Sequence, residues 1–204
     1  MIRQIRTLLT RNDLDKIPSL AERHKRILSY LTALTYDPDN LVSWRSITAL
    51  GLSAGVIAEK DPEYVRIHLR RLMWLLNDES GGIGWRAPEA MGEIIRSRPE
   101  LFGEFIPILV SILDMEPEDA PPFRAGTLWA LGRLASIAPS QIESALPNIL
   151  ICLVDSDPQT RGMAIWCLSQ MQSTAAITNK QDLLKDENPV LLYQDGQIFH
   201  FTVG

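Results

Sequence analysis

Residues 124–132, RAGTLWALG, are followed 37 residues later by a similar stretch at residues 161–169, RGMAIWCLS. The closing letters of both stretches also occur earlier in the chain, as Ala49-Leu50-Gly51 and Ala90-Met91-Gly92. The four closing small residues are spaced by 41, 40 and 37 residues. Periods of this length are typical of stacked helical pairs. The sequence therefore predicts an all-α fold, an α-solenoid of four to five such pairs.

The boundaries of the helical pairs follow from Asp and Pro residues. Asp37, Asp78 and Asp155 each lie 14 residues before a closing small residue. Pro suits the first turn of a helix, where its missing N–H is not needed. Each repeat is predicted as helix A, a turn and helix B, over residues 41–59 and 62–77, then 85–98 and 99–114, then 123–138 and 139–154.

The apolar pattern of the predicted second helix of repeat one supports these boundaries. Val65, Leu69, Leu72 and Leu76 recur at helical spacing and predict its buried stripe. Glycine costs a helix about 1 kcal/mol relative to alanine. We therefore expect the Gly or Ser after each Ala-Leu pair to allow two helices to approach closely.

We predict a single domain over residues 1–204 with different parts along its length. Residues 1–36 read as a degenerate N-terminal repeat, and residues 37–172 carry the regular repeats. Residues 173–204 are expected to hold a final helix and a small C-terminal β-hairpin cap. In that hairpin, two apolar-rich runs flank Asp195-Gly196, a strong hairpin-turn signal.

The composition favours a cytoplasmic protein without a membrane span. No stretch approaches 18 uninterrupted apolar residues, and the first residues lack the apolar core of a secretory signal. Cys152 and Cys167 lie within helical patterns, so we expect free buried thiols in a reducing compartment.

Charge is unevenly distributed along the chain. The net charge is −5, yet residues 1–71 carry 12 Lys/Arg against 8 Asp/Glu, and residues 72–204 carry 8 against 17. Fifteen of the twenty basic residues are Arg, which favours recognition of carboxylates or phosphates. We expect a protein partner of acidic character at the basic end, although an unevenly charged solvated surface has the same composition.

The stretches at residues 124–132 and 161–169 resemble the HEAT-like repeat of the phycobilisome-lyase type. In that repeat an acidic turn ending in Arg precedes Ala-Leu-Gly, and residues 157–161, DPQTR, match the turn. The resemblance covers about residues 37–172, but repeats one and two carry their arginines two positions later, as Arg45 and Arg86. It implies an α-solenoid that usually binds proteins, with no specific activity.

Some proteins that this chain resembles are enzymes. Deoxyhypusine hydroxylase, which resembles this fold, holds iron with His-Glu pairs, whereas His24, His68 and His200 are isolated here, so we expect no metal and no cofactor. Two alternatives stay open, namely a bilin-lyase-like maturation factor for a cofactor-bearing protein and a HEAT-like DNA glycosylase. The negative net charge makes nucleic acid an unfavourable partner.

The loop at residues 81–86, GGIGWR, is a possible anion-binding loop, carried by Gly82, Gly84, Trp85 and Arg86. Glycines before a helix expose N–H groups to an anion, and the helix dipole assists. The loop lacks the Lys-Ser/Thr of a nucleotide-binding P-loop. A simple turn between repeats is the alternative.

We predict a non-catalytic protein-interaction scaffold or adaptor that binds its partner on the concave face. Ile67, Arg71 and Trp74 lie off the buried stripe of helix B in repeat one. A shift of 41 residues places Arg26, Tyr30 and Ala33 beside them. We predict a partner-binding cluster of the kind enriched at interface hot spots, consisting of Arg26, Tyr30, Arg71 and Trp74. The alternative is that Trp74 packs in the core.

Overall fold

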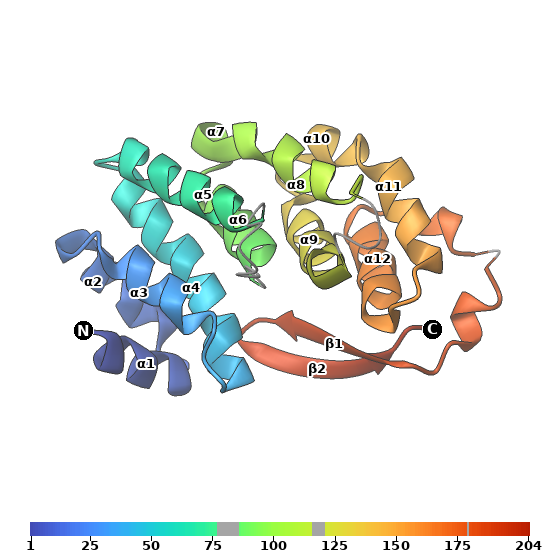
Figure 1. Ribbon diagram of the computed structural model, residues 1–204, viewed down its shortest axis with the longest axis horizontal. Helices are drawn as coiled ribbons and strands as arrows, with labels where there is room; N and C mark the ends of the chain where they lie inside the picture. Colours follow the sequence, from blue (N-terminus) through green and yellow to red (C-terminus); the bar gives the residue numbers. More distant parts are fainter. Residues whose placement is uncertain (77–85, 116–120, 179) are drawn as a thin grey trace. The chain divides into compact units, whose positions relative to one another are not determined.

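The computed structural model describes residues 1–76, 86–115, 121–178 and 180–204. These residues form two compact units. Unit 1 comprises residues 1–103 and 195–197, and unit 2 comprises residues 104–194 and 198–204. Both units consist mainly of helices (Figure 1), which confirms the helical class. The single domain and the solenoid stacking stay predictions.

The elements of unit 1 are mostly short helices around one long one. They are α1 (Ile2–Thr10), η1 (Leu14–Lys16), α2 (Ile17–Arg23), α3 (Ile27–Leu34), α4 (Asn40–Ala58), α5 (Pro62–Leu76), α6 (Ala87–Ser97) and α7 (Pro99–Phe102), with the 3₁₀ turn η2 (Gly103–Phe105) at the boundary in the sequence.

Unit 2 contains the remaining helices and nearly all of the only two strands in the described residues; Gln197, the first residue of β2, belongs to unit 1. Its elements are α8 (Ile106–Ile112), α9 (Pro121–Leu134), α10 (Pro139–Glu143), α11 (Leu146–Ile151), η3 (Cys152–Val154), α12 (Pro158–Gln170), η4 (Thr174–Ala176), η5 (Leu183–Lys185), β1 (Pro189–Gln194) and β2 (Gln197–Thr202).

Helix α4 is the core helix of unit 1. It begins where the Asp39 carboxylate accepts hydrogen bonds from the backbone N–H groups of Leu41 and Val42. It contacts α2, α3, α5 and α6. By length and composition α4 could cross a membrane, but most of it is buried inside this unit. Its apolar character is therefore explained by packing within the protein.

Two of the four closing small residues, Gly51 and Gly132, sit where helices touch, as the sequence predicts, whereas Ser169 is exposed. A Cβ atom on Gly51 would lie 2.7 Å from the Glu93 carbonyl oxygen, so α4 meets the backbone of α6 directly. In unit 2, a Cβ atom on Gly132 would collide with the Trp166 ring, where α9 and α12 lie side by side (Figure 1). Larger side chains at these two positions would force the helix pairs apart.

The second helices of repeats two and three are not continuous, contrary to the prediction. Residues 99–114 form α7, η2 and α8, and residues 139–154 form α10, α11 and η3. Pro107 and Pro147 occupy the first turns of α8 and α11. Proline cannot donate the bond that would continue the preceding helix, so each helix restarts there. Pro107 and Pro147 each lie eight residues after the proline that starts the predicted second helix. Arg70 is the residue eight positions after Pro62 in α5, and α5 is unbroken.

The C-terminal segment confirms the hairpin and corrects the final helix. No α-helix follows α12 in the described residues 171–178 and 180–204, which hold only the 3₁₀ turns η4 and η5 before the strands. Asp195 and Gly196 have φ of 49° and 79°, as a tight hairpin turn requires. A Cβ atom on Gly162 would lie 2.5 Å from Val190, so β1 packs tightly against α12.

Arg–Asp pairs join successive repeats within each unit. Arg6 Nε donates to Asp37 at 2.7 Å in unit 1, and Arg124 Nη1 donates to Asp155 at 2.8 Å in unit 2, each across 31 residues. Arg161 of the resembling turn donates to Asp186. By contrast, Arg45 is buried and donates to the carbonyls of Leu9, Thr10 and Gly196. The displaced arginine therefore serves a different contact.

The contact between α4 and α6 can be tested with two glycines of one helix. Gly51→Ala is expected to lower the melting temperature, because the new methyl group meets a backbone carbonyl and overpacking costs about 1–3 kcal/mol. Gly55→Ala is the matched control, since its Cβ atom would lie 3.4 Å from Ser97, an ordinary contact. Its better helix propensity should raise the melting temperature. Equal shifts in thermal denaturation would contradict the close contact.

Candidate functional site

Helix α5 has one buried face and one face open to solvent. Its predicted stripe is buried, which leaves Ile67 and Trp74 with 41% and 74% of their surface exposed. Arg71 lies between them at helical spacing and is also exposed. A Trp this exposed on a well-packed helix is unusual, since large aromatic side chains are normally mostly buried. Trp74 therefore belongs to the surface and not to the core.

The neighbouring helix α3 runs beside α5 in a register that differs from the sequence period. Thr32 Oγ1 lies 2.9 Å from His68 Nε2, and Lys25 Nζ lies 2.6 Å from Asp61 Oδ2; both pairs are 36 residues apart. In this register Arg26 and Tyr30 lie at the level of the first turns of α5. The 41-residue shift placed them about five residues further along, roughly 7 Å.

The predicted residues therefore lie along two adjacent helices and do not meet at one point. Arg26 is exposed and Tyr30 is half-buried. Arg71 and Trp74 are in the C-terminal half of α5, beyond the level of Tyr30. The pair that sits on one stripe with Ile67 is Arg71 and Trp74, and these three side chains form the surface we call the α5 face.

The α5 face carries an uncompensated positive charge. Glu63, at the start of the helix, accepts hydrogen bonds from Arg66 and Arg70, and these two arginines lower the pKa of its carboxyl group. Arg71 has no ion-pair partner among the described residues. Its guanidinium, with an exposed indole beside it, can form a bidentate pair with a carboxylate.

Beneath the α5 face lies His68, a buried titratable group. Its ring nitrogen bonds to the Thr32 hydroxyl, and the residue is only 6% exposed. Burial, with a smaller contribution from Arg71, lowers the pKa of His68 from 6.5 to about 4. His68 is therefore neutral at physiological pH and fixes α3 against α5.

The proposed anion loop lies mostly outside the described residues, since Gly82, Gly84 and Trp85 are not among them. Arg86 is described and is already engaged. It donates to Glu89 at 3.1 Å and to Asn40 at 3.4 Å, and its guanidinium lies 4.2 Å from the centre of the Trp44 ring. These contacts give Arg86 a structural role.

Glu89, the partner of Arg86, is almost fully buried. Burial raises the pKa of its carboxyl group, while the Arg86 charge acts in the opposite direction. One of its oxygens, Oε2, has no hydrogen-bond partner among the described residues. Glu89 is thus a buried carboxyl group held by Arg86, whose guanidinium lies over the Trp44 ring, and the sequence analysis did not predict this cluster.

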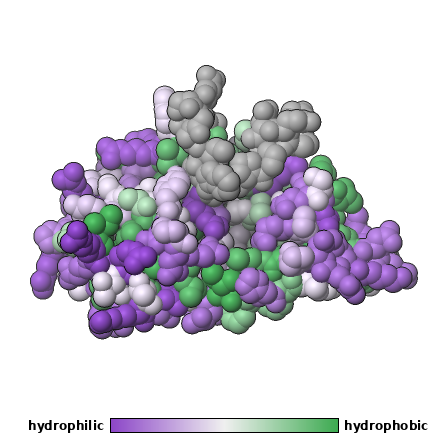
Figure 2. All heavy atoms as spheres, turned by 60° about the horizontal axis from the view of Figure 1, so that its bottom comes forward, coloured by the Kyte–Doolittle hydropathy of each residue, from purple (hydrophilic) through white to green (hydrophobic). Residues whose placement is uncertain are grey.

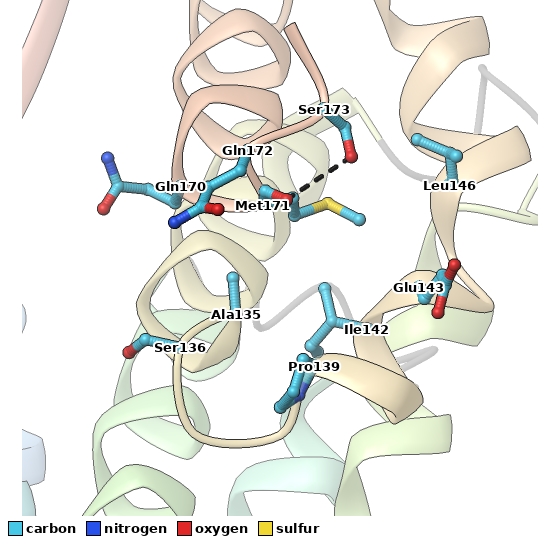
Figure 3. Close-up of a pocket in the computed structure, with 10 residues that line it drawn as sticks. All are labelled: Ala135, Ser136, Pro139, Ile142, Glu143, Leu146, Gln170, Met171, Gln172 and Ser173. Carbon is cyan, nitrogen blue, oxygen red and sulfur yellow. Dashed lines mark hydrogen bonds between the residues drawn. The ribbon is translucent and has the colours of Figure 1, made fainter.

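Unit 2 contains a separate cavity of about 470 Å³. It opens between the α9–α10 turn, the start of α11 and the end of α12 (Figure 3). Ile142 and Met171 supply apolar walls, and Glu143 is the one charged residue that lines it. Among the described residues no group of three or more His, Cys, Asp or Glu could hold a metal ion. Sequence periodicity gave no signal for this cavity.

One part of the chain is similar to a known repeat family. Residues 121–171 match the HEAT-like repeat, and these residues hold α9 to α12 of unit 2. HEAT-like repeats are commonly scaffolds for protein interactions and are generally not enzymes. An uncharacterized protein of Archaeoglobus fulgidus is 33% identical over 120 residues, which are 59% of this chain. The chain spans 58% of the length of that relative.

The buried His68 makes the stability of the protein depend on pH. Because its folded-state pKa lies below the unfolded value, its contribution is complete above about 6.5 and is lost as the pH falls towards about 4. The loss amounts to about 3 kcal/mol. In urea unfolding, His68→Gln should flatten this part of the pH profile. His24→Gln, at an exposed position, is the control and should leave it unchanged. A profile unaffected by His68→Gln would contradict this assignment.

Proposed function

We propose that this protein is a non-catalytic scaffold that binds an acidic protein partner through the α5 face. The observation that carries the proposal is Trp74, a large side chain with 74% of its surface exposed on a helix whose other side is fully packed. Exposed aromatic and Arg side chains of this kind dominate the energy of protein interfaces. The HEAT-like repeat match supports a binding role.

The choice of an acidic partner rests on charge. Residues 1–71 carry 12 basic against 8 acidic side chains, and Arg71 is exposed with no ion pair among the described residues. A carboxylate that reaches Arg71 would be flanked by the apolar surfaces of Ile67 and Trp74. Partial exclusion of water there would strengthen the ion pair relative to one in bulk solvent.

Several finer features belong to the same proposal. We place the protein in the cytoplasm, with Cys152 and Cys167 as buried thiols whose pKa values burial raises to about 11 and about 12. We also propose an α-solenoid of the phycobilisome-lyase type, with α5 lining its concave side. The Asp157–Arg161 turn and its ion pair with Asp186 support that type.

The α5 face can be tested by capture of partners from native extract, followed by titration of the recovered partner. Trp74→Ala and Arg71→Glu should each weaken that binding by at least about tenfold, or 1.4 kcal/mol, while thermal stability changes little because both side chains are exposed. Added salt should weaken the wild-type complex, since an exposed ion pair is screened.

Two matched variants serve as controls. Arg23→Glu reverses a charge on another exposed helix of unit 1, and Ile151→Ala removes an exposed apolar side chain in unit 2. Both should retain wild-type affinity. Retention of every partner by Trp74→Ala and Arg71→Glu would rule out the α5 face. A gel shift with duplex DNA at physiological salt tests the glycosylase alternative, and absorbance of the purified protein tests for a bound chromophore.

A further inference from the structure

The two edges of the β-hairpin are treated differently by the rest of the protein. The register follows from the Val203 N–H, which donates to the Asn188 carbonyl at 3.1 Å. Because antiparallel pairs alternate along the strands, the backbone groups of residues 189, 191 and 193 point away from β2. In the same way, those of residues 198, 200 and 202 point away from β1.

The outer edge of β1 is closed by side chains of unit 2. The Gln159 amide forms two hydrogen bonds with Leu191, accepting from its N–H at 2.8 Å and donating to its carbonyl at 2.7 Å. Trp129 Nε1 donates to the Tyr193 carbonyl at 2.9 Å. Pro189 has no N–H to offer at the remaining position. This edge cannot accept another strand.

The outer edge of β2 is open. Ile198, His200 and Thr202 have no backbone hydrogen bond on that side within the described residues. Phe199 and Phe201 stack with ring centroids 6.2 Å apart, and 44% and 52% of their surfaces are exposed. Figure 2 brings the hairpin side of Figure 1 forward and shows hydrophobic surface over the strands.

Nothing in β2 discourages pairing with another strand. Edge strands are usually protected by Lys, Pro or a bulge. The strand reads QIFHFT, with no Lys, Pro, Asp or Glu. Since β1 is closed and β2 is open, one additional strand completes the hydrogen bonding of this sheet.

We propose that β2 pairs with β2 of a second copy of this chain, antiparallel and centred on His200. This register places Ile198 opposite Thr202 of the second copy, and His200 opposite its own counterpart. It therefore uses every outward backbone group of both strands. Phe199 then lies opposite Phe201 of the second copy in a non-hydrogen-bonded pair, the kind with the closest side chains.

A second copy suits this edge because the strand is self-complementary. An isologous interface requires one surface that matches itself about a two-fold axis, and an uncharged strand brings no like charges together. The two stacked Phe side chains of each copy meet their counterparts on one face of a four-stranded sheet. Because the shared edge is short, we expect a reversible equilibrium that depends on concentration.

Sedimentation analysis of the full chain over a concentration series tests the pairing. The wild-type protein should pass from monomer to dimer as its concentration rises. His200→Pro removes the central outward N–H, while the bonds between β1 and β2 remain, so the dimer dissociation constant should rise at least about tenfold. His200→Lys should do the same by placing two like charges in the central pair.

Disulfide trapping tests the register and does not depend on the proline variant folding. In the proposed pair, the two copies of position 200 have Cα atoms about 5.5 Å apart, within the range of a disulfide. His200→Cys should therefore form a covalent dimer on mild oxidation. Thr202→Cys is the matched control, because its two copies would lie about 14 Å apart. The unchanged chain is the blank for Cys152 and Cys167, which are both buried.

Three results would overturn the proposal. One is a chain that stays monomeric up to its solubility limit. This holds also if the monomer binds an extended peptide of another protein along β2. Another is a dimer that survives both His200→Pro and His200→Lys. The third is trapping through Thr202→Cys as efficient as through His200→Cys. Each of these outcomes leaves the α5 face unaffected, because that face is tested by different residues in unit 1.

Discussion

The close approach of neighbouring first helices is the constraint on which the rest of each unit depends. At Gly51 only a hydrogen atom separates α4 from the Glu93 carbonyl, and at Gly132 only a hydrogen atom separates α9 from the Trp166 ring. Once two helices are this close, their remaining apolar side chains must interlock at interior packing density. The second helix of each pair then covers one side of this layer with its apolar stripe and leaves its other side outside.

This arrangement explains why the candidate binding surface lies on α5. A helix that belongs to the outer layer needs only one apolar face. The side chains on its other face, Ile67, Arg71 and Trp74, are therefore not needed for packing in the core. The partly buried Thr32–His68 hydrogen bond holds α5 against α3 below them. The surface is thus presented by a rigid element, and a rigid surface loses little conformational entropy when a partner binds.

The acidic turns show how one residue type serves two purposes. Asp39 and Asp157 cap α4 and α12 by accepting hydrogen bonds from backbone N–H groups. Two residues earlier, Asp37 and Asp155 each bind an arginine of the preceding repeat and the backbone N–H that follows. Each turn therefore starts a helix and ties it to its neighbour. The same geometry recurs at Asp186, directly before the hairpin.

By itself the sequence determined the helical class, the positions of the first helices, the unbroken α5 and the Asp-Gly hairpin, because these depend on local periodicity, capping and turn chemistry. Pro107 and Pro147 are local signals that were sufficient to predict the breaks in the second helices. The prediction of continuous helices followed the regular spacing of the repeats instead. Only the tertiary structure decided that Trp74 is exposed and that residues of α3 contact residues of α5 that lie 36 positions later in the sequence. It also decided that Gln159 and Trp129 close the outer edge of β1, while the outer edge of β2 stays open. Those facts depend on which surfaces meet in space, and contacts across many residues leave no periodic trace in the chain.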